Sequence, residues 1–218
     1  MATGKTGGGD VCVRREWAMV DEKVRNIGIL LFPDVEELDA IGPWEVLSFW
    51  AAAFPDDGWR VFCCSADGKS VTCSKGLTVE PHHAIGDMPA LDVLVHPGGD
   101  GTRPQLADAE HVEWIRSQRR SVPLLAGVCT GSLVFAAAGL LSGRPATTHW
   151  ASLGYLAELD PTIDVRPDER FVDDGDIVTS AGISAGIDMA LHLVSRLASP
   201  QRARDVRRGI QYDPEPPV

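Results

Sequence analysis

The sequence predicts an α/β fold in which a mostly parallel sheet is sandwiched between helices. Apolar runs of strand length alternate with segments of helical periodicity along the chain. Strands that are apolar throughout must be covered on both faces, which is typical of a parallel sheet between helices. The 218 residues suit a single large domain, because no repeat, linker or change of composition divides them.

The first half of the chain supplies most of the expected buried strands. The run RNIGILLF at Arg25–Phe32 is the first, and Pro33 closes it. Val71–Val79 is expected to form a short hairpin. The other elements expected here are strands at Trp59–Ser65, Leu91–His96 and Val122–Val128, and helices at Glu36–Ala53, Ala107–Arg119 and Ser132–Leu141. For the first helix, a start at Pro43 is the alternative.

The second half continues the same alternation with shorter pieces. Expected strands are Ala146–Thr148, Val165, Phe171–Val172 and Ile177–Ser180, and expected helices are Ala151–Glu158, Ser184–Leu197 and Gln201–Arg207. Residues 1–22 are rich in glycine and polar residues, and we expect a disordered extension there, with Met19 as a candidate natural start. Residues 23–218 are then the folded domain.

The amino-acid composition disfavours several kinds of binding partner. The formal net charge of -11 disfavours a nucleic-acid-binding protein, since an acidic surface repels phosphates. No apolar run approaches the roughly 18–20 residues of a membrane span. The five cysteines form no C-x-x-C pair, and their odd number without an apolar leader favours a reducing, cytoplasmic location. A small molecule is therefore the expected ligand, with no metal site.

The strongest chemical signal is the pentapeptide Gly127-Val128-Cys129-Thr130-Gly131. It follows a buried strand and opens a helix, which is the G-x-nucleophile-x-G pattern with cysteine as the nucleophile. Such a turn strains the backbone, places backbone N–H groups beside the reacting atom, and lowers the thiol pKa through the helix N-terminus. The alternative is a small buried cysteine in a tight turn.

Three further segments are expected near this thiol. His96–Gly101 contains a Gly-Gly pair after a buried strand, and the Gly99 N–H is a candidate oxyanion donor. The acidic loop Pro33–Asp39 offers four carboxylates, of which the pattern selects none as a proton donor. His149 follows the elbow helix and is a candidate partner of the thiol, unless Thr148 merely caps the next helix.

Several stretches together resemble the ThiJ/PfpI superfamily. They are IGILLFPDVEELDAIGPWEVL, LDVLVHPGGDGT, GVCTGSLVFAAAGLLSGRPATTHW and SAGISAGIDMALHLV. The resemblance implies a flavodoxin-like fold of the class I glutamine-amidotransferase type. GVCTGSLV and ATTHW look most like isonitrile hydratases, and also like sensor domains of AraC-type regulators. We expect no DNA-binding domain after Val218, and on this expectation the hydratase is the favoured interpretation.

The resemblance also assigns residues. It places the nucleophile on Cys129, the carboxyl that contacts it on Asp39, and a further catalytic role and a backbone donor on Thr130. Gly99 is the second donor, and Gly98 and His149 are supporting residues. The aromatic side chains Trp44 and Trp150 are candidates for lining a substrate pocket, and Asp188 is expected to be structural.

The function expected from this resemblance is hydration of an isonitrile to an N-substituted formamide. It requires no metal or organic cofactor and implies a small-molecule substrate and a homodimer. Two alternatives use the same thiol. One is a cofactor-free glyoxalase or deglycase acting on small aldehydes, which Asp39 in place of glutamate disfavours. The other is a redox or ligand sensor, in which Cys129 is oxidised or a ligand is bound without turnover.

Overall fold

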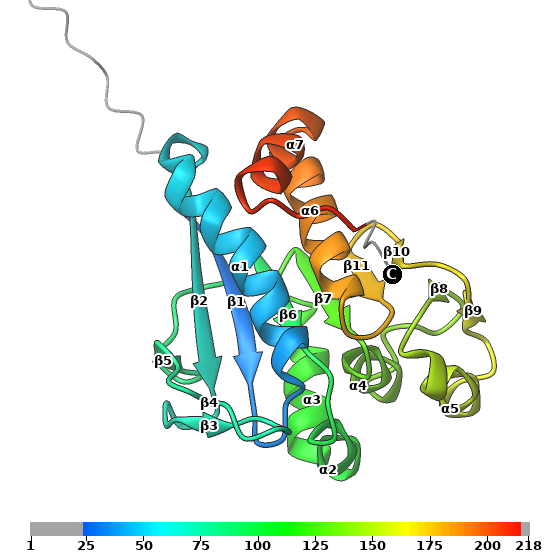
Figure 1. The fold of residues 1–218 in the computed structure, drawn as a ribbon. Helices are drawn as coiled ribbons and strands as arrows, with labels where there is room; N and C mark the ends of the chain where they lie inside the picture. The colour runs from blue at the N-terminus through cyan, green and yellow to red at the C-terminus, as the bar shows by residue number, and fades with distance from the viewer. Residues whose placement is uncertain (1–23, 215–218) are drawn as a thin grey trace, which may run out of the picture.

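A seven-stranded sheet forms the centre of the protein (Figure 1). The structure, a computed structural model, describes residues 24–214. The strand order is β10-β11-β7-β6-β1-β2-β5, and every neighbouring pair is parallel except β10–β11. The strands are β1 Arg25–Leu31, β2 Trp59–Ser65, β5 His83–Ala84, β6 Val93–His96, β7 Leu124–Val128, β10 Phe171–Asp173 and β11 Ile177–Ser180. The predicted mostly parallel sheet is confirmed.

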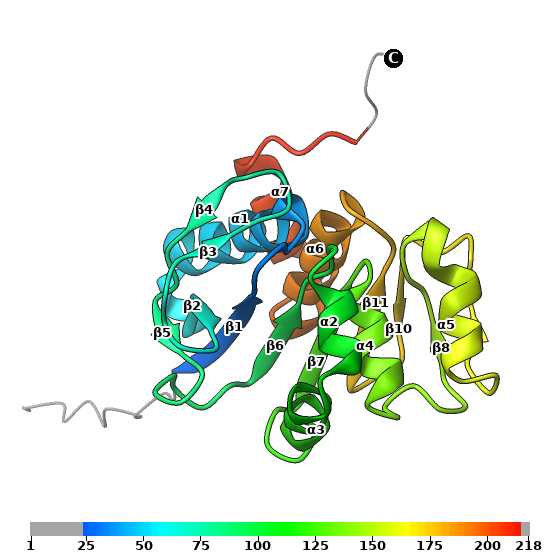
Figure 2. The same cartoon turned by 90° about the horizontal axis from the view of Figure 1, so that it is seen from below.

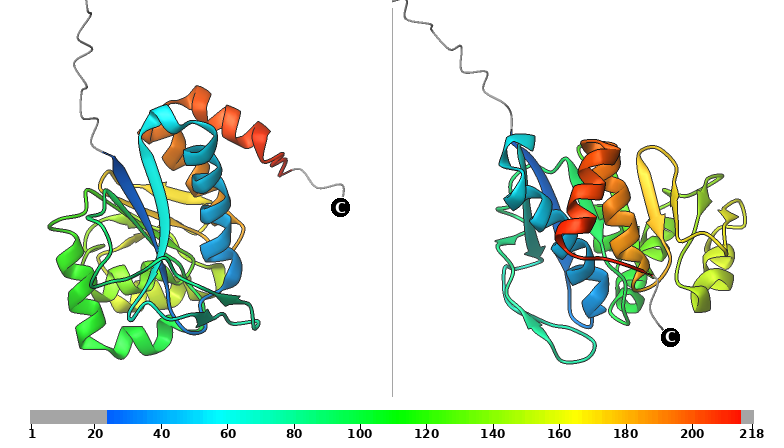
Figure 3. Two further views of the ribbon diagram at one scale, coloured as in Figure 1. Left: turned by 90° about the vertical axis from the view of Figure 1, so that its left-hand side faces the viewer. Right: turned by 45° about the horizontal axis from the view of Figure 1, so that its top comes forward.

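Helices cover both faces of this sheet, as the apolar strands require (Figures 2 and 3). One face carries α1 Glu37–Ala53, α6 Ala185–Leu197 and α7 Pro200–Gly209, and the other carries α2 Thr102–Ala107, α3 Ala109–Gln118 and α4 Gly131–Ala137. Strand residues such as Ile27, Val95 and Leu125 are completely buried between the two layers. The sheet is therefore the rigid support from which the loops project.

Smaller elements flank the sheet. The predicted hairpin is present as β3 Val71–Thr72 and β4 Thr78–Val79, paired antiparallel. On the other side lie the parallel pair β8 Pro145–Ala146 and β9 Asp164–Val165, the 3-10 turn Trp150–Ser152 and α5 Leu153–Leu159. A second 3-10 turn, Pro55–Asp57, follows α1. Within residues 24–214, no helix is long and apolar enough to cross a membrane.

Several element boundaries differ from the sequence prediction. Helix α1 begins at Glu37 and continues through Pro43, so the later start is wrong. The helix expected at Ala107–Arg119 is confirmed as α3, which begins at Ala109 because Asp108 caps it by accepting hydrogen bonds from the backbone N–H groups of Glu110 and His111. Helix α2, which ends at Ala107, was not predicted. Strand β5 was not predicted. The expected extension 1–22, with Met19, lies outside the described residues.

Candidate active site

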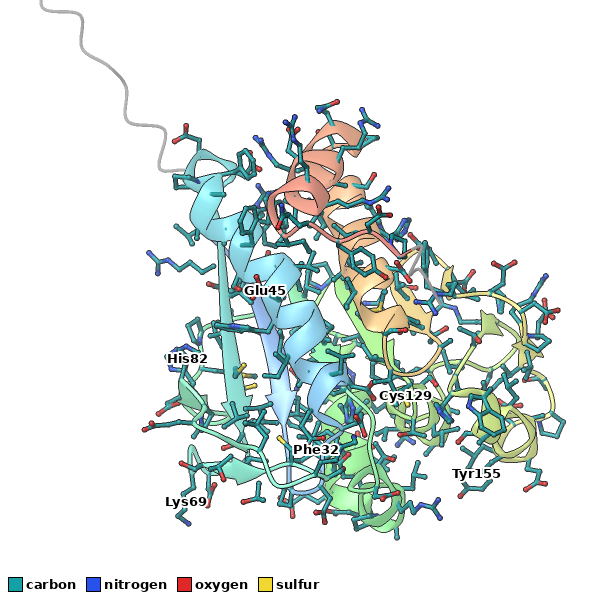
Figure 4. The ribbon with its side chains drawn as sticks, viewed as in Figure 1. Phe32, Glu45, Lys69, His82, Cys129 and Tyr155 are labelled. Atoms are coloured by element: carbon teal, nitrogen blue, oxygen red, sulfur yellow. The ribbon has the colours of Figure 1, made fainter. Side chains whose placement is uncertain are left out.

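Cys129 lies between the end of β7 and the start of α4, at the carboxyl edge of the sheet (Figure 4). Its φ of 56° is in the left-handed region, which is the backbone strain predicted for a nucleophile elbow. Its carbonyl accepts hydrogen bonds from the Ser132 hydroxyl at 2.9 Å and the Thr148 hydroxyl at 2.8 Å. Thr148 therefore stabilises the backbone turn at Cys129. The following 3-10 turn is capped by His149, so the capping role expected for Thr148 is wrong.

Asp39, in the first turn of α1, is the carboxylate that reaches the thiol. Its side chain is fully buried beside Cys129, and its Oδ2 accepts a 3.1 Å hydrogen bond from the Gly98 N–H, while Oδ1 has no hydrogen-bond partner among the described residues. Burial raises its pKa to about 7, although the contacts with Cys129 and Gly98 oppose the rise. Glu36 and Glu37 instead pair with Lys75 of the hairpin. The geometry thus selects Asp39 from the acidic loop.

The glycine loop after β6 packs directly against Asp39 and Thr130. A Cβ on Gly98 would lie 2.6 Å from the Thr130 backbone nitrogen and 2.8 Å from Asp39 Oδ2. Gly99 has a φ of +121°, and a Cβ there would lie 2.3 Å from the Glu36 nitrogen. Only glycine fits at either position without movement of the backbone.

The Gly99 N–H is not directed at the cavity as an open donor. It donates to the Thr130 hydroxyl at 2.9 Å, so the sequence-based expectation of a free oxyanion donor at Gly99 is not met in this structure. Thr102 completes the arrangement, since its hydroxyl donates to the Gly99 carbonyl at 2.7 Å and lies 3.1 Å from Thr130 Oγ1. Sequence reasoning missed Thr102, although it closely follows the glycine loop.

The protonation of Cys129 differs from the expectation of a lowered thiol pKa. Burial and the adjacent Asp39 carboxylate raise the pKa of Cys129 well above its ordinary value. The backbone N–H and hydroxyl of Thr130 act in the opposite direction and favour the thiolate. Near neutral pH the thiol therefore keeps its proton, while Asp39 changes between its protonated and ionised forms.

A cavity of about 760 Å³ opens in front of the thiol. Apolar parts of its wall come from Leu106 on α2, Leu133 on α4, Tyr155 on α5 and Ile183 before α6. Figure 4 labels Cys129 and Tyr155, which lie toward the same end of the molecule. The remaining lining residues are Glu36, Ser74, Lys75, Gly99, Asp100, Thr102, Arg103, Thr130, His149, Ala151 and Ser152. This site is large enough for a small organic molecule.

Neither predicted pocket tryptophan lines this cavity. Trp44 stacks on His82 with ring centroids 5.3 Å apart, and Trp150 is 78% exposed. Both positions follow the motif loops in sequence, but their side chains point elsewhere. The sequence pattern gives proximity along the chain and does not give the direction of a side chain.

His149 lies beside the thiol without a hydrogen bond to it among the described residues. A Cβ on Gly182 would lie 2.2 Å from the His149 ring and 3.2 Å from Cys129 Sγ, so imidazole and thiol flank the same glycine. The His149 Nδ1 accepts a 3.3 Å hydrogen bond from the Ala151 N–H. Asp188 lies apart, where it binds Arg170 and the Tyr212 hydroxyl.

Comparison with known proteins identifies the family of this chain. A model of the DJ-1/PfpI family matches residues 25–196. The chain belongs to the DJ-1/PfpI family. A solved structure of a ThiJ/PfpI family protein from Pseudomonas syringae has 31% sequence identity and a TM-score of 0.79, and the match covers 94% of this chain and 86% of that one.

Curated relatives of this DJ-1/PfpI protein include an enzyme and a regulator. An isonitrile hydratase from Pseudomonas putida is 43% identical over 88% of this chain and 80% of its own length. The HTH-type transcriptional regulator CdhR from Pseudomonas aeruginosa is 36% identical over 81% of this chain. The chain spans about half of that regulator, since the match covers 52% of it.

Proposed function

We propose that this protein is an isonitrile hydratase that converts R–N≡C and water into an N-substituted formamide. The observation that carries the proposal is the buried Asp39 carboxyl beside Cys129, whose thiol lines a cavity large enough for the substrate. The 43% identity to an isonitrile hydratase supports the choice of reaction. Thiol, carboxyl and water supply every atom that the reaction needs.

The proposed first step joins the thiol to the substrate carbon. Asp39 takes the Cys129 proton and delivers it to the terminal isonitrile carbon while the sulfur forms a C–S bond to the same carbon. The product is a thioimidate, R–N=CH–S–Cys. The Thr130 N–H stabilises negative charge on the sulfur during this step.

The second step releases the product. Asp39, now ionised, removes a proton from water, and the oxygen adds to the thioimidate carbon. The nitrogen accepts a proton, the C–S bond breaks, and the thiolate recovers its proton, which leaves R–NH–CHO. A pKa near 7 suits one carboxyl for acting as acid and then as base at neutral pH.

The test is formamide formation from a panel of alkyl and aryl isonitriles. Cys129→Ala and Asp39→Asn should each reduce turnover by about a thousandfold or more, because each removes a group that takes part in bond making. Cys64→Ala, which removes a buried thiol on β2, is the matched control and should retain turnover. Near-native activity in either site variant contradicts the mechanism.

Aldehyde chemistry is a second candidate, favoured by one observation. His149 and Cys129 border the same cavity, and an imidazole there suits proton transfer at an aldehyde carbon. The discriminating assay offers methylglyoxal to the unaltered protein. Lactate formation without any formamide from the isonitrile panel favours this candidate over the hydratase.

A further inference from the structure

His96, at the carboxyl end of β6, has both ring nitrogens in defined contacts. The Nδ1 lies 2.7 Å from the Pro97 carbonyl oxygen, and the Nε2 lies 3.2 Å from the Nε2 of His111 on α3. A carbonyl oxygen only accepts, so the Nδ1 carries the proton. The Nε2 is then an acceptor and receives the His111 Nε2–H. A single arrangement of protons on neutral His96 satisfies both contacts.

The surroundings keep His96 neutral. The ring is fully buried, and the rings of Phe32 and Phe135 pack near it, with centroids 5.4 Å and 6.0 Å away. Burial, with a smaller contribution from His111, lowers the pKa of His96 to about 3. Burial also lowers the pKa of His111, while the Asp108 carboxylate opposes that change. The hydrogen bond to Pro97 therefore persists throughout the pH range in which Asp39 titrates.

The Pro97 carbonyl and the Gly98 N–H belong to the same peptide unit. That unit is planar and trans, so the oxygen and the N–H point in opposite directions. Fixing the oxygen on the imidazole consequently fixes the direction of the Gly98 N–H, which donates to Asp39 Oδ2 at 3.1 Å. Among the described residues, no backbone N–H donates to the Pro97 carbonyl, so the imidazole is its hydrogen-bond partner.

We propose that His96 is a positioning residue for Asp39: its Nδ1–H orients the Pro97–Gly98 peptide so that the Gly98 N–H reaches the carboxylate, and His111 fixes the proton on that nitrogen. The contact with Asp39 does not depend on which substrate the site takes. The consequence for catalysis rests on the proposed function. Without the imidazole, the peptide is free to rotate and the ionised carboxylate loses a donor.

The test is a carbon-13 NMR titration of the Asp39 carboxyl in aspartate-labelled protein, with the resonance assigned by its loss in Asp39→Asn. His96→Phe keeps an aromatic ring and removes both nitrogens. In this variant, the titration midpoint of the Asp39 carboxyl should rise by about one pH unit, because the ionised carboxylate loses a hydrogen-bond donor. His96→Asn places an amide nitrogen as many bonds from Cα as Nδ1, and should restore the original midpoint.

His83→Phe is the matched control, because it makes the same replacement on β5 at the far edge of the sheet. It should leave the Asp39 midpoint unchanged. An unchanged midpoint in folded His96→Phe overturns the proposal. If circular dichroism shows that His96→Phe does not fold, His96→Leu, which also lacks both nitrogens, takes its place: a raised midpoint supports the proposal, and an unchanged one overturns it. The titration needs no substrate, so a failure of isonitrile hydration would be detected separately.

Discussion

At the scale of single residues, Asp39 makes the Cys129 thiol harder to ionise, whereas Cys129 favours the ionised form of Asp39. The carboxylate is buried, and its negative charge lies against a thiol that is also buried, so ionising both groups is costly. At neutral pH the pair therefore keeps a proton available for transfer. Substrate entering the cavity meets a thiol that already lies beside its base, and this arrangement shortens the path of the proton.

Burial of Asp39 also makes stability depend on pH. In the unfolded chain this carboxyl ionises near 3.8, and in the folded protein near 7. Between these values the unfolded state releases a proton that the folded state retains, so the Asp39 contribution to stability falls as pH rises through this window. Asp39→Asn should therefore increase the free energy of unfolding at pH 8 by roughly 1–3 kcal/mol.

Urea unfolding of both proteins at pH 4 and pH 8 measures this effect. At pH 4 the folded carboxyl is protonated in the unaltered protein, so the difference between the two proteins should be much smaller. An equal difference at both pH values would show that Asp39 does not titrate in this window.

Thr130 is expected to act through its hydroxyl as well as its backbone N–H. The hydroxyl accepts the Gly99 N–H at 2.9 Å. Thr130→Val keeps the shape and leaves that N–H without its acceptor, so formamide formation should fall about tenfold or more. Thr130→Ser retains the acceptor and should keep most of the activity. Equal turnover in the valine and serine variants would exclude a role for the hydroxyl.

Sequence reasoning located the nucleophile better than its surroundings. The elbow pattern depends on local backbone geometry, which five consecutive residues determine, and Cys129 has the expected left-handed φ. The choice of Asp39 required the family resemblance, because four carboxylates share one loop and only the packing of α1 selects among them. The occupied Gly99 N–H depends on the Thr130 rotamer, which no local pattern encodes.

At the scale of elements, close approach between β6 and α4 assembles the site. A Cβ on Gly131 would lie 2.2 Å from the His96 carbonyl oxygen and 2.8 Å from the Pro97 oxygen. Gly131→Ala must therefore push backbone against backbone, and it should reduce the free energy of unfolding by about 2–4 kcal/mol. Urea unfolding at neutral pH provides the measurement.

Gly154→Ala is the matched control for this change. Gly154 lies in α5, and a Cβ there would meet nothing within 4 Å. Since alanine favours a helix over glycine, this variant should gain about 0.5–1 kcal/mol. Similar losses in both variants would mean that the contact between α4 and β6 has no special importance.

Long strands and helices were the elements that the sequence predicted well. Trp59–Ser65 and Ile177–Ser180 match β2 and β11, because continuous burial leaves a continuous apolar run. Short elements were missed for a physical reason. Strand β5 has two residues and helix α2 has six, which is too short a pattern to detect.

At the scale of the whole molecule, the resemblance to relatives implies a homodimer, which we retain as a proposal. Two exposed leucines are candidates for the contact, since Leu38 lies in the first turn of α1 and Leu77 belongs to the adjoining hairpin. The Lys75 N–H donates to Glu37 Oε1 at 2.6 Å and ties these segments together. Sedimentation velocity should show a dimer for the unaltered protein and a larger monomer fraction for Leu38→Glu. A monomer at every concentration contradicts the proposal.

The walls of the cavity and its reactive base come from different parts of the fold. The base is made of tight glycine loops on the sheet, where added atoms collide with backbone. Much of the apolar wall comes from Leu106 and Tyr155, which lie on helices outside the sheet. An engineer seeking a new range of side groups on the substrate should therefore randomise these two positions and leave the glycine loops untouched. The same separation gives natural descendants of this chain a route to new substrates that leaves the reacting groups in place.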